Sequence, residues 1–293
     1  MAASTVGSTY RAAPLLLNLE RDEKRWRVTS TWCNLGLWRG GVTRFGSACE
    51  KLAVAVGEAA ELQTCSTLLD VGVGYGDQTA LWATRFGVQH VMAVEPSHAH
   101  VEAARAAQAE GRLAGASVVE LHVGSSNALP AAVRSMRYDA VICLDCAYHF
   151  RTRASFLATA SELMKPGGRF AAADIIVASP QNGAEPQGWA AIWRSGARRL
   201  IALLTDIPAA NLCSRSSYVS SLEAAGMTSV RVERVTEHVF APFAAHAGAQ
   251  RSALHSQLTF AERLFLRFIQ ALFSFIARHA LFDFVIVHAR RPE

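Results

Sequence analysis

Residues 67–78 read Thr67-Leu-Leu-Asp-Val-Gly-Val-Gly-Tyr-Gly-Asp-Gln78, a short apolar run that leads directly into three alternating glycines. Glycine adopts backbone angles that other residues avoid, and it lets another molecule approach the main chain closely. The helix-like segment that follows offers free N–H groups in its first turn. The stretch therefore predicts a buried strand, a tight glycine turn and a helix in succession.

The spacing of the glycines separates this turn from the dinucleotide-binding pattern G-x-G-x-x-G. That pattern requires glycine at position 77, where this chain has Asp77. The turn instead reads G-x-G-x-G, and Asp70 precedes it within the strand. The next strand candidate ends in an acid, Glu95. An acid at that position can accept hydrogen bonds from both hydroxyls of a ribose.

From this segment onward, strand-like apolar runs alternate with helix-like segments. The runs are 67–71, 90–95, 117–123, 139–144 and 169–175, and the helix candidates are 78–86, 98–112, 130–136 and 153–164. Two later strand candidates, 228–238 and 281–289, bring the total to seven. This alternation predicts a Rossmann-like α/β fold with a mostly parallel sheet and helices on both faces.

Outside the alternation, the pattern predicts additional helical segments. Residues 11–62 combine short apolar patches with charges, so we expect residues 1–62 to form a helical lid and residues 63–293 the main domain. Further helix candidates are 188–204, 216–225 and 259–280. From these candidates we expect substrate-cap insertions at residues 180–227 and 245–280.

Composition limits the class of protein. The 293 residues are 51% hydrophobic and 18% charged, so a large core can form. The formal charge of +5 is almost entirely arginine, and no basic run with interleaved aromatics predicts a nucleic-acid partner. The C-x-x-C pair Cys143 and Cys146 is interpreted as reduced core thiols. No apolar run is long enough for a membrane span. We expect a cytoplasmic protein, although the first 19 residues weakly resemble a transit peptide.

Five segments in a fixed order resemble the motifs of class I S-adenosylmethionine-dependent methyltransferases, specifically the type 11 group that acts on small molecules. The segments are 68–76, 94–96, 123–130, 138–145 and 163–169. The resemblance covers roughly residues 30–290. It implies S-adenosylmethionine as cofactor and a small-molecule acceptor. Residues 31–38 are also similar to the N-x-G-Y-W segment, which forms part of a lid in small-molecule members.

The resemblance implies a cofactor site at the carboxyl ends of the strands. Asp70 would bind the ammonium group of the cofactor, directly or through water, and Glu95 would bind its ribose. Members usually carry an acid that bonds the adenine after the third strand, where this chain has Ser125, with Ser126 next to it. The predicted cofactor residues are Asp70, Gly72, Gly74, Gly76, Gln78, Glu95, Ser125, Ser126 and Asp145.

The segment after the fourth strand contains the catalytic candidates. His149 is the predicted base, because the ordinary pKa of histidine lies near 6.5. Asp174, at the end of the fifth strand, is predicted to orient His149, and Tyr148 to shape the acceptor pocket. This set implies O-methylation of a hydroxyl. No metal is expected, because the sequence contains no H-E-x-x-H pattern.

Two other functions stay open at this stage. An N- or C-methyltransferase would act on an amine or on a sterol-like, lipophilic acceptor. A binding protein that keeps the fold without catalysis is suggested by Ser125. A nucleic-acid methyltransferase is not expected, because the N-P-P-Y tetrad used on extruded bases is absent.

The helix candidate 259–280 carries a polar stripe on a strongly apolar helix. The stripe contains Arg263, Arg267, Gln270, Ser274 and Arg278. One interpretation is that the helix packs on the sheet and the stripe faces water. The other is that part of the apolar face is exposed, at the entrance for a lipophilic acceptor or at a membrane surface.

Overall fold

The computed structural model describes residues 13–22, 25–111, 118–179 and 187–293. The chain divides into two compact units. The sheet unit is Leu52–Thr236 with Ala280–Glu293, and the small unit is Met1–Lys51 with Glu237–His279. The predicted boundary between residues 62 and 63 and the predicted cap insertions stay predictions.

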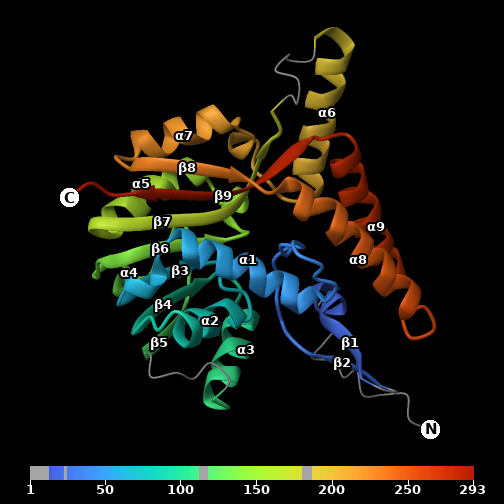
Figure 1. Ribbon diagram of the computed structural model, residues 1–293, viewed down its shortest axis with the longest axis horizontal. Coiled ribbons are helices and arrows are strands. Elements are labelled where there is room, and N and C mark those ends of the chain that lie inside the picture. The colour runs from blue at the N-terminus through green and yellow to red at the C-terminus, as the bar shows by residue number, and fades with distance from the viewer. Residues whose placement is uncertain (1–12, 23–24, 112–117, 180–186) are drawn as a thin grey trace. The chain divides into compact units, whose positions relative to one another are not determined.

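The sheet unit contains seven strands in the order β5-β4-β3-β6-β7-β9-β8 (Figure 1). The strands β3 to β7 are parallel, and β9 lies antiparallel between β7 and β8. This arrangement confirms the predicted Rossmann-like class. The bounds are β3 (Thr67–Val71), β4 (His90–Glu95), β5 (Val118–Val123), β6 (Tyr138–Leu144), β7 (Met164–Val177), β8 (Thr228–Arg234) and β9 (Phe282–Arg290).

Helices cover both faces of the sheet (Figure 1). Two of them begin at N-caps, since Ser97 accepts a hydrogen bond from His100 N and Thr152 accepts one from Ser155 N. The predicted segments differ from the structure mainly at their ends, and Arg112 and Ser117 lie outside the described residues. In chain order, the helices between residues 45 and 224 are α1 (Phe45–Ala59), α2 (Asp77–Arg85), α3 (His98–Ala109), α4 (Ala131–Arg134), α5 (Arg153–Leu163), α6 (Gly188–Leu204) and α7 (Arg215–Ala224).

The small unit contains a β-hairpin where only helices were expected. Strands β1 (Leu19–Asp22) and β2 (Arg25–Val28) pair antiparallel, with Leu19 opposite Val28. Exposed and half-buried residues alternate along β2. Alternation with a period of two is the signal of a strand with one covered face, so the helical prediction was wrong here.

Helices α8 (Phe240–Ala253) and α9 (Phe260–Arg278) complete the small unit. They pack closely, because a Cβ atom at Gly248 would lie 2.6 Å from Nε2 of Gln270. Gln270 of the predicted polar stripe therefore faces α8, which differs from the expectation that the stripe faces water. Four apolar side chains of α9 are exposed, namely Phe260, Leu264, Phe268 and Phe275. Contact of this face with a membrane or a lipophilic acceptor stays a prediction.

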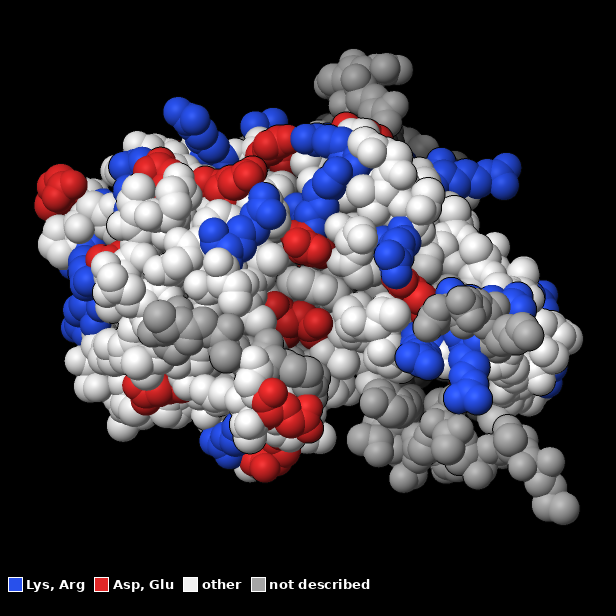
Figure 2. Space-filling view, turned by 60° about the horizontal axis from the view of Figure 1, so that its bottom comes forward, with Lys and Arg blue, Asp and Glu red and all other residues white. Residues whose placement is uncertain are grey.

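The surface shows no single dominant charge on the face in Figure 2, where basic and acidic side chains are interspersed. No helix in the described ranges is both long enough and apolar enough to cross a membrane. All six cysteines are free, in agreement with the interpretation of Cys143 and Cys146 as reduced thiols.

Candidate active site

The glycine turn joins β3 to α2 at the carboxyl edge of the sheet. Gly72, Gly74 and Gly76 have φ of 84°, 56° and 95°, a region that favours glycine. A Cβ atom at Gly72 would lie 2.6 Å from the sulfur of Cys146. Gly72 is therefore required for packing against the segment that follows β6. Gly76 stands at the N-cap of α2, where the turn meets the free N–H groups of the helix.

Asp70 lies fully buried below this turn. Its carboxylate accepts hydrogen bonds from Gln78 Nε2 at 2.7 Å, Trp82 Nε1 at 2.8 Å and Thr79 Oγ1 at 3.2 Å. Burial raises the pKa of Asp70 to about 7, although these hydrogen bonds favour the charged form. Asp70 and Gln78 thus tie β3 to α2. Binding of the cofactor ammonium group by Asp70, directly or through water, stays a prediction.

Glu95 lies at the carboxyl end of β4, beside the glycine turn. One carboxylate oxygen accepts a hydrogen bond from Gly74 N at 3.0 Å, and the other accepts from Ser97 N and contacts His100 Nδ1, both at 3.2 Å. A carboxylate offers about four acceptor positions, so a ribose with two hydroxyls would replace one of these bonds. The ring of Tyr75 lies 4.3 Å from that of His100. These residues fit a ribose next to an aromatic surface.

Ser125 and Ser126 form a tight turn after β5. Ser125 pairs with Ala128 through both main-chain hydrogen bonds, at 3.4 and 3.0 Å. The hydroxyl of Ser126 contacts Asn127 Oδ1 at 3.1 Å, and the amide of Asn127 donates to the carbonyl of Arg151. The turn is therefore connected to the loop after β6. A contact with adenine stays a prediction.

The loop after β6 begins at Asp145, which has a positive φ of 58°. Its main-chain N–H donates to Ala173 O at 2.9 Å, and its carboxylate accepts the hydroxyl of Tyr148 at 2.9 Å. Burial raises the pKa of Tyr148 well above its ordinary value. The Tyr148 hydroxyl is thus engaged within the loop, and it fixes the conformation of the loop just before His149.

His149 contacts the main chain of the segment that follows α6. Its Nδ1 lies 3.2 Å from the carbonyl oxygen of Asp206. A carbonyl oxygen only accepts hydrogen bonds, so Nδ1 must carry the proton and the lone pair of the neutral ring lies on Nε2. The ring keeps exposed surface, yet the surrounding protein atoms lower the pKa of His149.

The Asp174 carboxylate is held by partners other than His149, and its predicted role in orienting His149 stays a prediction. Its buried carboxylate pairs with Arg153 Nη1 at 3.0 Å and accepts the hydroxyl of Tyr218 at 2.7 Å. Strand β7 continues to Val177, beyond the predicted end at residue 175. Asp174 therefore lies within the sheet, and its side chain is held by α5 and α7.

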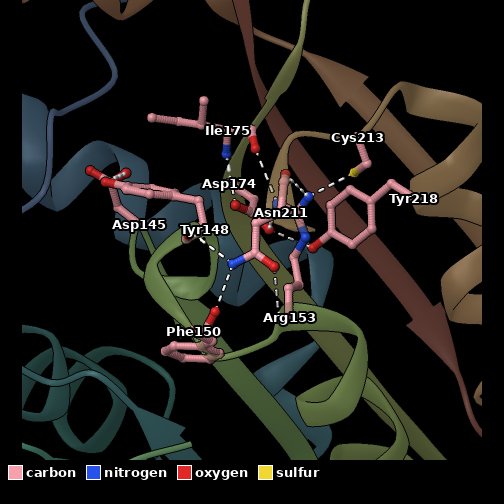
Figure 3. A network of polar contacts seen from close by, with 9 residues as sticks. All are labelled: Asp145, Tyr148, Phe150, Arg153, Asp174, Ile175, Asn211, Cys213 and Tyr218. Carbon is pink, nitrogen blue, oxygen red and sulfur yellow. Dashed lines mark hydrogen bonds and ion pairs between the residues drawn. The ribbon is translucent and has the colours of Figure 1, made fainter. Parts of the chain in front are cut away.

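Arg153 and Asn211 complete a buried polar network that the sequence did not reveal (Figure 3). Arg153 Nη2 donates to Asn211 O at 2.8 Å. The Asn211 amide donates to the carbonyls of Tyr148 and Phe150, at 2.9 and 2.7 Å. Asn211 ends the short 3-10 helix Ala209–Asn211 in the connection between α6 and α7, and only its contacts across the fold mark it. Among the described residues, no group of His, Cys, Asp or Glu is arranged to hold a metal ion.

Comparisons with known proteins agree with this arrangement. Residues 69–172 match the family model described as a methyltransferase domain. Erythromycin 3''-O-methyltransferase of Saccharopolyspora erythraea is 30% identical over 238 residues, which cover 79% of this chain and 73% of that protein.

Solved structures show the same fold at lower identity. A putative sarcosine dimethylglycine methyltransferase from Galdieria sulphuraria has a TM-score of 0.71 at 16% identity, covering 88% of this chain and 93% of that one. Mycolic acid cyclopropane synthase CmaA1, complexed with S-adenosylhomocysteine, has a TM-score of 0.71 at 15% identity, covering 88% and 89%. The chain therefore belongs to the class I methyltransferases that act on small molecules with S-adenosylmethionine as cofactor.

Proposed function

We propose that this enzyme transfers the methyl group to a hydroxyl oxygen of its acceptor, with His149 as the general base. The observation that carries the proposal is the hydrogen bond from His149 Nδ1 to Asp206 O, which leaves the lone pair on Nε2. The relative from Saccharopolyspora erythraea is itself named as an O-methyltransferase.

In the proposed reaction, the bound cofactor supplies a methyl group on a sulfonium. The glycine turn and Glu95 would hold that cofactor. The acceptor oxygen would take up the methyl group as it gives its proton to His149 Nε2, and the imidazole would keep that proton. General bases contribute roughly 10²- to 10⁴-fold to rates, and alignment of the reacting atoms contributes more.

The acceptor is proposed to be a hydroxylated natural product. The name of the relative points to macrolides that resemble erythromycin. The His149 loop also borders an apolar cluster that contains Tyr148, Ala202 and Ile207. These three side chains are buried, so they support the loop from within the core.

A screen with isotopically labelled methyl donor tests the proposal. Purified enzyme is incubated with a panel of hydroxylated macrolides and with matched amines, and the products are identified by mass and by the NMR shift of the labelled methyl. A label on oxygen supports the proposal. A label on nitrogen or carbon contradicts it, and failure to bind S-adenosylhomocysteine in calorimetry would favour a binding protein without catalysis.

A further inference from the structure

We infer that Asn211 is a positioning residue, which holds the His149 loop so that the ring keeps its bond to Asp206. The inference rests on the proposed role of His149. It concerns a residue that contacts neither the predicted cofactor residues nor the imidazole itself.

First, the Asn211 side chain holds the main chain on both sides of His149. Its Nδ2 donates to the carbonyls of Tyr148 and Phe150, while its Oδ1 accepts from Arg153 N at 3.0 Å. The side chain is 3% exposed, so water does not offer replacement partners. Loss of this amide would leave the buried carbonyl of Tyr148 and the partly buried carbonyl of Phe150 without these donors, and an unpaired buried acceptor is unfavourable.

Second, Asn211 is itself fixed from behind by a buried ion pair. Arg153 Nη2 binds Asn211 O, and Arg153 Nη1 pairs with Asp174. A buried charge pair is costly to break, because the loss of either partner leaves an uncompensated charge. The carboxylate of Asp174 therefore reaches the His149 loop through Arg153 and Asn211 (Figure 3).

Third, the same connection between α6 and α7 supplies both holding contacts. Asp206 O binds the His149 ring, and Asn211 binds the main chain that carries the ring. The exposed ion pair between Arg151 and Asp206 adds little, as surface pairs do. The buried amide is thus the contact that sets the geometry of the loop.

The test compares Asn211→Asp and Asn211→Ala with the wild-type enzyme. Aspartate keeps the size of the side chain and the acceptor for Arg153 N, so this variant remains informative if the alanine variant does not fold. Its carboxylate oxygens repel the carbonyls of Tyr148 and Phe150. Gln108→Ala is the matched control, because Gln108 Nε2 donates to a main-chain carbonyl, that of Val119, away from the site.

Nitrogen-15 spectra of the histidine side chains report which ring nitrogen carries the proton. Wild type and the control are expected to show His149 protonated on Nδ1. The Asn211 variants are expected to show a mixture with the Nε2-protonated form, with S-adenosylhomocysteine affinity within about threefold of wild type. With the acceptor from the screen, kcat should fall at least about tenfold, as expected for a misplaced catalytic group.

The possible failures are distinguishable. If wild-type His149 is protonated on Nε2, the proposed function fails and the inference falls with it. If His149 carries its proton on Nδ1 in the wild type and also in folded Asn211→Asp, the positioning role of Asn211 is overturned, but the proposed function is not. In a double-mutant cycle, Asn211→Asp should have no further effect on kcat in a His149→Ala background, and additive losses would contradict a role through His149.

Discussion

The imidazole of His149 donates its Nδ1 proton to the main-chain carbonyl of Asp206, 3.2 Å away. A main-chain carbonyl carries no ionisable proton, so this bond selects one tautomer without a direct bond from a charged group to the ring. A carboxylate in its place would favour the protonated imidazole and raise its pKa. The observed partner is therefore suited to a base that must stay neutral before the reaction.

Replacement of His149 by alanine is expected to lower kcat by roughly 10²- to 10⁴-fold, because the proton of the hydroxyl loses its acceptor. Affinity for S-adenosylhomocysteine should stay unchanged, since the glycine turn and Glu95 are not altered. Steady-state kinetics and calorimetry measure the two effects. A variant that loses cofactor affinity to the same extent would show that His149 is structural.

The acid limb of the pH profile of kcat is expected below the ordinary histidine range near pH 6.5. The surrounding protein lowers the pKa of His149, so the ring stays neutral, and able to accept a proton, to lower pH. Activity is lost only as the pH falls through this lowered pKa. The limb should vanish in His149→Gln, and a limb above pH 7 in the wild type would disagree with the structure.

Glu95→Gln is expected to weaken S-adenosylhomocysteine binding by about 10- to 100-fold. Charge-assisted hydrogen bonds contribute roughly 1.5–3 kcal/mol, and glutamine removes the charge while it keeps the size of the side chain. Glu120→Gln serves as the control, because Glu120 contacts His90 at 2.8 Å, away from the glycine turn. Equal affinities of Glu95→Gln and wild type, measured by calorimetry, would rule out the ribose contact.

Because of Asp70, the free energy of unfolding is expected to decrease as the pH rises from about 4 to 7. The folded pKa of Asp70, about 7, exceeds the ordinary aspartate pKa of 3.8, so the native state binds more protons than the unfolded state in this window. The slope approaches about 1.4 kcal/mol per pH unit. Urea unfolding at several pH values measures it, and Asp70→Asn should lack this contribution. Identical pH slopes for the two proteins would refute the raised pKa.

Under the membrane-surface interpretation of α9, its exposed apolar residues are expected to bind a lipid surface. Its arginines would contact anionic headgroups, so flotation with anionic liposomes should recover the enzyme, and added salt should reduce recovery. Phe268→Ser is expected to lower recovery because Phe268 is exposed on α9. Protein that stays entirely unbound at low salt removes this interpretation.

Much of the fold could be predicted because its signals are local. Apolar runs such as 67–71 and 139–144 indicate strands that are buried on both faces. The hairpin of β1 and β2 was missed, because its strands have only four residues each. Periodicity over so few residues does not separate a strand from a helix.

The candidate site also has one part that local sequence signals predicted and another part that they did not. The glycine turn, Glu95 and His149 stand next to recognisable strand ends, so the sequence alone determined where they would lie. The partners of the buried polar groups were decided only by tertiary structure, because each buried donor or acceptor must find a partner wherever the packing places one. Asp174 pairs with Arg153, and Asn211 reaches Tyr148 across 63 positions of the chain. No periodicity or spacing in the sequence encodes such pairs.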